Sequence, residues 1–488
     1  MSKLFDVYSL VSSLSQTEKR YFKLFAQLQK TQSNYIVLFD ILNNCKNFDE
    51  QIIHNKISKK NNATPVASVL TKLSQLILKS VVNYHNKNDI AAESIKFLIS
   101  KGLYEEGVRL LKQKKKKAYI NESYLELVTL LNSELILIEV MQLSKNTSEK
   151  IKAIQKEHLL FINHINEYAN LRFIYTELII FARMYGVIKN NSSLTKLNSI
   201  VSNELIYKNK KYDSVRNQAF YSQIMGLYYF IKQDYEQSRI FLQKTISIYE
   251  QYAFVALENP KQLSNMLGNL LLTLLFTKKL SHFKEYVKKF KSSVEQFPFS
   301  KTAKIDFQIK LYSLNLRYYW ITKEFNIGLK LSLEIESWIM KNKSRLVSHY
   351  LEVLFLFIAL QYFAVSDFNK ALFWNNKNIY YKNTKLAFSE IFSFSSILNI
   401  IIHYELKNYI LLESILNRNY QKERFSVLGN IVITHLRKIL LLKNKKPKTI
   451  FNDLYNEVNN IQKNPFDKDI GYQYDFLIFW LENKLSDG

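Results

Sequence analysis

A short spacing recurs along most of this chain: an apolar or aromatic residue, another six positions later, and a small or apolar residue three positions after that. Residues three or four apart share one face of a helix, so a step of six places the second residue beyond a turn. The spacing therefore predicts pairs of antiparallel helices joined by tight turns. The six occurrences are Leu98, Tyr104 and Gly107; Tyr229, Tyr235 and Ser238; Leu274, Leu280 and Phe283; Tyr319, Phe325 and Gly328; Tyr362, Phe368 and Ala371; and His403, Tyr409 and Leu412.

Polar residue pairs mark the turns between these helices. They separate segments in which apolar residues recur every three or four positions, which is the pattern of amphipathic helices. The pairs are Gln233-Asp234, Lys278-Lys279, Lys323-Glu324, Ser366-Asp367 and Lys407-Asn408.

The segment from Gln218 to Gln251 shows the pattern most completely. Small side chains at Gly226 and Ser238 allow two helix backbones to approach closely. Tyr229 and Tyr235 are expected to fill the groove beside that contact.

These offsets resemble the tetratricopeptide repeat, a helical pair of about 34 residues. The last four occurrences begin 45, 43 and 41 residues apart, so we expect longer helices than in that repeat. The resemblance implies a right-handed superhelical solenoid of antiparallel helix pairs, whose concave surface holds peptides or assembles complexes. Gln223, Phe230 and Ile231 are the residues expected on a peptide-binding concave face.

Composition supports an all-α fold. The 488 residues include only nine glycines and five prolines, whereas sheets joined by tight turns need more of both. The single cysteine, Cys45, cannot form an intramolecular disulfide, so we expect a reducing, cytoplasmic setting. No signal peptide is expected, and the most apolar window, Leu351 to Val365, contains Glu352 and is too short to span a bilayer.

Residues 1–88 are predicted to form a separate helical unit. Ser15 and Glu18 have the spacing of a capping box that opens a helix, with Tyr21, Phe22, Leu24 and Phe25 facing inward. Further helices are expected over Asn34–Leu42, Asp49–Ile57 and Thr64–His85. Two interpretations remain open: an N-terminal cap of the solenoid, or a helix-turn-helix-like unit that binds DNA.

Three further regions are predicted. Residues 89–212 form irregular helical pairs, residues 213–425 form the tetratricopeptide-like repeats, and residues 426–488 form a C-terminal cap with a last helix over Tyr472–Leu485. The spacing is lost between Asn121 and Asn209, where long helices are expected over Glu122–Leu143, Ser148–Ile165 and Asn170–Ile188.

The sequence offers little for catalysis. The glycines of Gly102–Gly107 have the spacing of a phosphate loop, but Val108 and Arg109 follow where such a loop needs Lys and Ser or Thr. The eight histidines are scattered without metal-ligand spacing, and no histidine partner for Cys45 is evident. We therefore predict that the protein is not an enzyme and uses no metal or cofactor.

The net charge of +26 predicts an anionic partner such as RNA or a ribonucleoprotein like the ribosome. Of the 68 basic residues only 11 are arginines, and this scarcity argues against sequence-specific recognition of nucleic-acid bases. The candidate phosphate-tracking lysines are Lys59, Lys60, Lys112, Lys114, Lys115, Lys116, Lys117, Lys208, Lys210, Lys211, Lys443, Lys445, Lys446 and Lys448.

Two functions fit these residues. In the first, the solenoid is a scaffold for RNA or a ribonucleoprotein, and binding weakens steeply with salt. In the second, it is a peptide-binding adaptor or sensor within a protein complex, and a transcriptional regulator if the N-terminal helices bind DNA. The sequence favours the first only through its charge.

Overall fold

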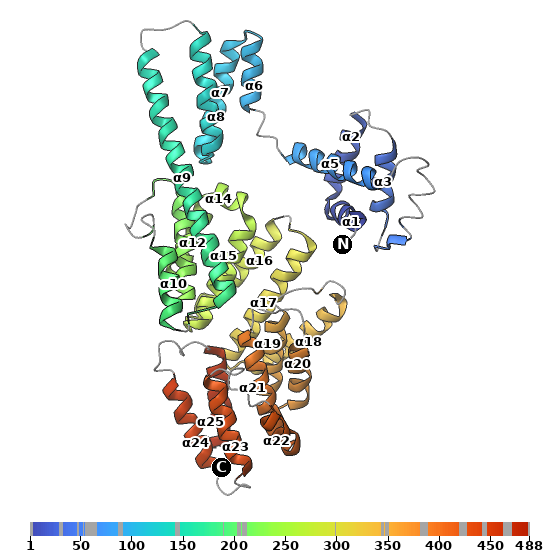
Figure 1. Ribbon diagram of the computed structural model, residues 1–488, viewed down its shortest axis with the longest axis vertical. Coiled ribbons are helices and arrows are strands. Elements are labelled where there is room, and N and C mark those ends of the chain that lie inside the picture. Colours follow the sequence, from blue (N-terminus) through green and yellow to red (C-terminus); the bar gives the residue numbers. More distant parts are fainter. Residues whose placement is uncertain are drawn as a thin grey trace. The chain divides into compact units, whose positions relative to one another are not determined.

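The computed structural model is all-α: the described residues form 23 helices and no strand (Figure 1). The chain divides into two compact units, Met1–Ile162 and Asn163–Gly488, which are treated separately below. No helix in the described part of the chain combines the length and the apolar character needed to cross a bilayer. The structure describes residues 3–28, 33–45, 48–51, 53, 66–85, 91–141, 147–188, 190–202, 206, 212–297, 299–342, 346, 351–380, 389–418, 427–441, 447–461 and 471–486.

The first part of unit 1 has a hydrophobic core of its own. It comprises α1 (Lys3–Ser13), α2 (Gln16–Leu28), α3 (Ser33–Asn43) and α5 (Val66–His85). The predicted capping box is confirmed, because the Ser15 N–H donates to Glu18 Oε2 at 2.6 Å and the Glu18 N–H donates to Ser15 Oγ at 3.3 Å. Phe22 is fully buried as expected, but Leu24 is 55% exposed, so its predicted inward orientation is wrong.

The expected N-terminal helices correspond in part to observed ones. α3 and α5 occupy the predicted Asn34–Leu42 and Thr64–His85 segments, whereas most of Asp49–Ile57 lies outside the described residues. The sequence analysis did not predict α1, although α1 supplies Leu4, Val7 and Val11 to this core.

The second part of unit 1 contains α6 (Ala91–Ser100), α7 (Tyr104–Ile120), α8 (Tyr124–Val140) and the start of α9 (Thr147–Tyr185). α9 is one helix of 39 residues, so the two separate helices predicted over Ser148–Ile165 and Asn170–Ile188 are wrong. The segment between them contains no Gly or Pro to end a helix, and its polar residues are compatible with helix continuation. The boundary between the two units falls within α9.

Unit 2 is built from consecutive helix pairs. After the rest of α9 and α10 (Asn191–Val201), the pairs are α12 (Val215–Ile231) with α13 (Tyr235–Gln251), α15 (Pro260–Phe276) with α16 (Phe283–Gln296), α17 (Lys301–Ile321) with α18 (Phe325–Asn342), α19 (Leu351–Ala364) with α20 (Phe368–Tyr380), and α21 (Ser389–Glu405) with α22 (Tyr409–Arg418). The short α14 (Ala253–Glu258) separates the first two pairs. Neighbouring pairs pack on one another, so this unit is a stack of helical hairpins (Figure 1).

Each predicted hairpin turn has the same hydrogen bonds. At every occurrence of the spacing, the carbonyl of the first residue accepts the N–H of the residue five positions later, as when Asp234 N donates to Tyr229 O at 2.9 Å. The residue immediately before the donor adopts a positive φ, which completes a Schellman motif. The equivalent bonds run from Leu103 to Leu98, Lys279 to Leu274, Glu324 to Tyr319, Asp367 to Tyr362 and Asn408 to His403.

A seventh turn of this kind lies between α7 and α8. Ser123 N donates to Ala118 O at 2.9 Å, and Glu122 has a φ of 48°. The residues Ala118, Tyr124 and Leu127 have the six-then-three spacing, so the sequence carried a signal that the prediction overlooked.

Close helix approaches occur at the small residues of the spacing. Ser238 Oγ donates to the Gly226 carbonyl at 2.8 Å, and a Cβ on Gly226 would lie 3.1 Å from the Leu242 side chain. At Gly328 a Cβ would lie 2.7 Å from Cδ of Gln361, whose amide donates to the Leu316 carbonyl at 2.9 Å. A Cβ at Gly328 would therefore force Gln361 to shift, whereas one at Gly226 would make a tight contact with Leu242.

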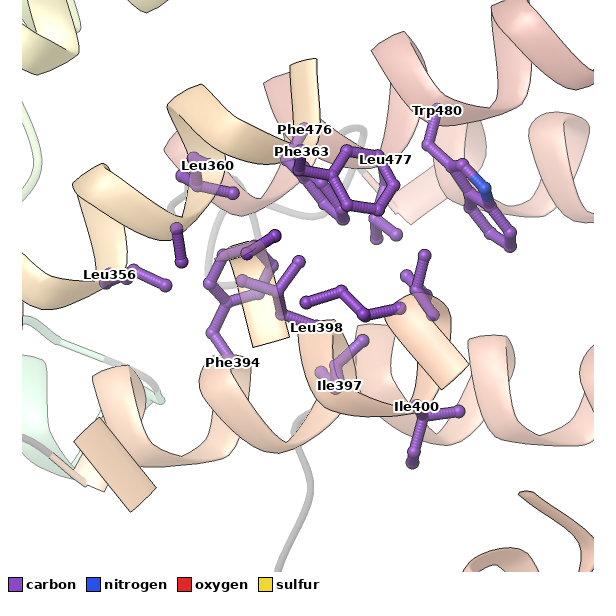
Figure 2. Packing of buried hydrophobic residues seen from close by; sticks show 14 of the residues in the cluster. Leu356, Leu360, Phe363, Phe394, Ile397, Leu398, Ile400, Phe476, Leu477 and Trp480 are labelled. Atoms are coloured by element: carbon purple, nitrogen blue, oxygen red, sulfur yellow. The ribbon is translucent and has the colours of Figure 1, made fainter. Parts of the chain in front are cut away.

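The C-terminal helices close the core of unit 2. α23 (Val427–Leu441), α24 (Pro447–Ile461) and α25 (Gly471–Ser486) share one hydrophobic cluster with α17 to α21. Figure 2 shows Phe476 of α25 beside Phe363, and Leu477 and Trp480 of the same helix in the same cluster. Phe476 and Trp480 are 0% and 2% exposed, so both side chains face the neighbouring helices.

A half-buried lysine lies between α15 and α17. The Lys310 side chain runs over Gly268, and its Nζ donates to Asn269 Oδ1 at 3.1 Å. Burial lowers the pKa of Lys310 to about 8, because no charged group compensates the ammonium for the water that it loses.

We predict that Gly328→Ala lowers the free energy of unfolding by about 1–2 kcal/mol, because the new methyl group displaces Gln361 from its bond to Leu316. Gly107→Ala is the control: its Cβ would lie 3.4 Å from the Leu137 side chain and 4.0 Å from Leu98 Cβ, both ordinary contact distances, and alanine favours the helix. Denaturant unfolding followed by circular dichroism measures both. Equal stability of the two variants would contradict the predicted clash.

We predict that Lys323→Gly raises the free energy of unfolding by about 0.5 kcal/mol. A left-handed conformation costs a lysine about 1–2 kcal/mol, which exceeds the entropy that glycine loses on folding. Lys323 has a φ of 58° and an exposed side chain. Thr322→Gly, one position earlier at a φ of −80°, should instead destabilise the protein in the same unfolding assay.

The lowered pKa of Lys310 predicts that the free energy of unfolding depends on pH. Between pH 8 and the ordinary lysine pKa the unfolded chain binds more protons at this site than the folded chain, so stability rises with pH across that window. Unfolding measured at pH 7 and pH 9.5 should differ by about 1–2 kcal/mol from this site. Lys310→Met should remove the rise, whereas Lys304→Met, at an exposed position of the same helix, should retain it.

Candidate functional site

The lysine run of α7 is partly neutralised within unit 1. Lys115 forms ion pairs with Glu134 of α8 at 2.7 Å and with Glu157 of α9 at 3.2 Å. Lys112, Lys116 and Lys117 are exposed, and Lys114 is half-buried. The most concentrated positive charge of the sequence therefore includes one residue whose role is to hold three helices together.

Most of the other candidate lysines cannot be placed. On the described residues, Lys448 is exposed near the start of α24 in unit 2. The prediction of a joined lysine strip therefore stays a prediction. The candidates outside the described residues are Lys59, Lys60, Lys208, Lys210, Lys211, Lys443, Lys445 and Lys446.

The residues proposed for a peptide-binding face have different environments. Gln223 and Ile231 are each 1% exposed, so neighbouring helices cover them. Phe230 is half-buried, and its ring contacts Tyr235 at 5.5 Å and Phe276 at 6.1 Å between centroids. Tyr235 and Phe276, which the Phe230 ring contacts, line a cavity of ligand size.

That cavity, which we call the turn pocket, has a volume of about 590 Å³ and lies in unit 2. The turns of the first two hairpins form two of its sides, and α17 and the start of α25 contribute the rest. Its lining residues are Lys232, Gln233, Asp234, Tyr235, Glu236, Leu275, Phe276, Thr277, Lys278, Arg317, Gly471, Tyr474 and Asp475.

Stacked planar groups form the floor of the turn pocket. The rings of Tyr235 and Phe276 are parallel within 4°, with centroids 4.2 Å apart. The Arg317 guanidinium carbon lies 4.1 Å from the centroid of Phe276 and the side chain is 5% exposed, a cation–π contact that extends the stack. Three successive hairpins thus contribute one planar group each to the column.

Charges of both signs surround this floor. Lys278 Nζ pairs with Asp475 Oδ1 of α25 at 3.0 Å. Glu236 pairs with Lys279 at 2.8 Å and Arg239 at 3.0 Å, and the hydrogen bond from Lys279 lowers the pKa of Glu236. Asp234 accepts the Gln237 N–H at 3.1 Å and caps α13.

Lys232 differs from these rim residues. It is exposed, its Nζ lies 5.8 Å from the ring centroid of Tyr228, and among the described residues it forms no ion pair. Its ammonium group is therefore the rim charge that remains available to a ligand.

Local sequence explains why the pocket exists. Schellman turns bring the residues around Gln233 and Lys278 to the same end of adjacent hairpins. Gly471 begins α25 without a side chain, and a Cβ there would lie 3.6 Å from the Phe276 ring. A larger residue would narrow the space above Phe276.

A second space in unit 2, lined by Gln223 and Tyr249 among others, measures about 30 Å³. That volume suits roughly one water molecule and excludes a peptide or cofactor. Gln223 is thus part of a small polar interior.

Chemically, the turn pocket is equipped for binding. Its acids are used in ion pairs or a helix cap, and its aromatic rings offer stacking surface. No group of three or more His, Cys, Asp or Glu side chains among the described residues is arranged to hold a metal ion. Sequence reasoning named Tyr235 as a turn residue but missed Phe276, Arg317 and the α25 residues.

Comparisons with known proteins add a distant structural likeness. No protein-family model matches the chain, and no curated protein matches it. Among solved structures, the chain is similar to the apo form of RapI, with 10% sequence identity over 82% of this chain and 98% of that chain, at a TM-score of 0.41. At that TM-score the likeness supports no inference about function.

Proposed function

We propose that this protein is a non-enzymatic helical-repeat adaptor that binds a peptide segment of a partner protein in the turn pocket. The observation that carries this proposal is the pocket itself, about 590 Å³ of concave space with a floor of stacked rings. Ligand sites in proteins are commonly 300–1,000 Å³ and combine apolar walls with a few polar groups.

The balance of charge at the pocket favours a peptide over a nucleic acid. Its lining includes three acids, Asp234, Glu236 and Asp475, and three bases, Lys232, Lys278 and Arg317. A phosphate-binding site needs a local excess of positive charge, which this lining lacks. Peptides carry both charges and amide groups, and they fit a mixed rim.

The turn residues also favour a preformed site. Schellman bonds fix both hairpin turns, and the Lys278–Asp475 ion pair links the second turn to α25. A ligand therefore meets side chains that are already ordered, which reduces the entropic cost of binding.

The experiment uses a displayed random-peptide library selected on the full-length protein, with synthetic hits measured by fluorescence anisotropy. Thr277→Trp fills the turn pocket, since Thr277 lines it. We expect this change to raise the Kd of the hits at least tenfold. Thr322→Trp is the matched control, because Thr322 is the equivalent turn residue of the α17–α18 hairpin and makes the same bond to the carbonyl four residues earlier.

The result is read together with two checks. Circular dichroism melting must show both tryptophan variants folded, and binding of a poly-uridine RNA is measured at low and moderate salt. Selected peptides whose Kd is the same for the wild type and for Thr277→Trp contradict the proposal. Tight, steeply salt-dependent RNA binding without any pocket-dependent peptide would support the RNA scaffold instead.

A further inference from the structure

The part of helix α9 that belongs to unit 2 carries apolar residues on two sides, and neighbouring helices cover only one of them. The covered side packs in the cluster that α9 shares with α10 and α12, and it consists of Leu171, Ile174, Leu178 and Phe181. On the other side Phe173 is 70% exposed and Ile180 is 50% exposed. A surface helix usually presents charged or polar residues to solvent, so this second apolar side requires an explanation.

The uncovered side has the spacing of a coiled-coil seam. Its residues follow one another in alternating steps of three and four, which keeps them on one face of the helix. We call them the α9 seam: Asn166, Ala169, Phe173, Thr176 and Ile180, all of them exposed. Arg183 stands at the next position of the series, so the apolar seam ends with Ile180.

Opposite charges flank this seam at a distance that fits a second copy of the same helix. Arg172 directly precedes Phe173 and Glu177 directly follows Thr176, five positions further along. Both are exposed, and neither forms an ion pair among the described residues. When two parallel helices pair through such a seam, the flanking residue before one seam position faces the residue five positions later in the partner. Two parallel copies would therefore form two Arg172–Glu177 ion pairs, related by symmetry.

The same charges oppose an antiparallel arrangement. Antiparallel helices bring equivalent flanking positions together, so Arg172 would approach its own copy and Glu177 would approach its own copy. Like charges at these distances are unfavourable. The charge pattern thus distinguishes one orientation of the two helices from the other.

Asn166 favours the same arrangement. An asparagine within an apolar seam is costly against an apolar partner, whereas two asparagines in register can hydrogen-bond to each other. In a parallel pair Asn166 lies opposite its own copy. An antiparallel pair centred on Phe173 and Thr176 would instead bring it to the level of Arg183 and Met184.

From the seam and its flanking charges we infer that unit 2 binds a second copy of this chain, with the two α9 helices parallel and in register. This interaction surface goes beyond the proposed peptide binding, since it uses no residue of the turn pocket. A seam of five positions buries less area than a standard interface, so we expect a dimer that forms at roughly micromolar concentrations.

Sedimentation velocity of the full-length protein over a series of concentrations tests the dimer. Phe173→Gln removes the largest side chain of the α9 seam and should raise the dimer Kd at least tenfold. Phe373→Gln is the matched control, because Phe373 is a 56% exposed phenylalanine on α20, away from α9, and its loss should leave the Kd unchanged. Circular dichroism melting verifies that both variants are folded.

A charge exchange tests the orientation. Arg172→Glu and Glu177→Arg, each alone, would place like charges opposite each other and should raise the dimer Kd about threefold to tenfold. The double variant restores opposite charges and should return the Kd to the wild-type value. Double-variant binding that stays as weak as that of the single variants would contradict the parallel pairing.

Cross-linking gives an independent measure of the orientation. Cys45 is the single cysteine of the sequence, so Cys45→Ser provides a background without thiols. In that background Ala169→Cys should give a covalent dimer on mild oxidation, because parallel helices place the two copies of position 169 opposite each other. An antiparallel pair would cross-link only a mixture of Ala169→Cys and Ile180→Cys, and that result would overturn the inference.

The remaining outcomes are also decisive. A protein that stays monomeric up to high micromolar concentrations overturns the inference, and so does a dimer that Phe173→Gln leaves intact. Thr277→Trp, which fills the turn pocket, should dimerise like the wild type. Failure of the peptide proposal and failure of the α9 dimer are therefore observed in separate measurements.

Discussion

The backbone bonds that close each hairpin turn are the constraint on which the rest of unit 2 depends. The N–H of the residue before the second helix donates to the carbonyl five positions earlier, and the residue immediately before that donor has a positive φ. Three residues then separate the helices of most pairs, which fixes their register. In four hairpins of unit 2 this register brings an aromatic residue before the turn against the first residue of the second helix, and the two rings form a repeated contact.

The helix pairs were predictable because their determinants are local. The six-then-three spacing places a small residue such as Ser238 opposite Gly226, and a turn bond forms within six residues of chain. Features that depend on tertiary contacts were not predictable in this way. Leu24 has helical spacing with buried neighbours but lies on an open flank, and α9 continues through a polar segment that the pattern predicts as a break.

The candidate site shows the same division between local and distant determinants. Phe230 and Tyr235 follow from the turn pattern, and sequence analysis named both. Phe276 of the next hairpin stacks on Tyr235, Arg317 of the hairpin after that lies over Phe276, and the start of α25 completes the wall from more than 200 residues beyond Tyr235. Spacing within one repeat says nothing about such contacts between repeats. For the same reason Gln223 and Ile231, which a single hairpin leaves on its surface, are buried by neighbouring helices.

The chemistry of the second aromatic position agrees with a division between covered and open turns. Phenylalanine occupies this position at Phe325, where Phe479 of α25 covers the ring. Tyrosine occupies it at Tyr235, which lines the turn pocket, and at Tyr409, which is 42% exposed. A hydroxyl group lowers the cost of leaving a ring in contact with water, whereas a ring under another helix needs no polar end. Tyr235 thus has one face packed on Phe276 while it lines the turn pocket.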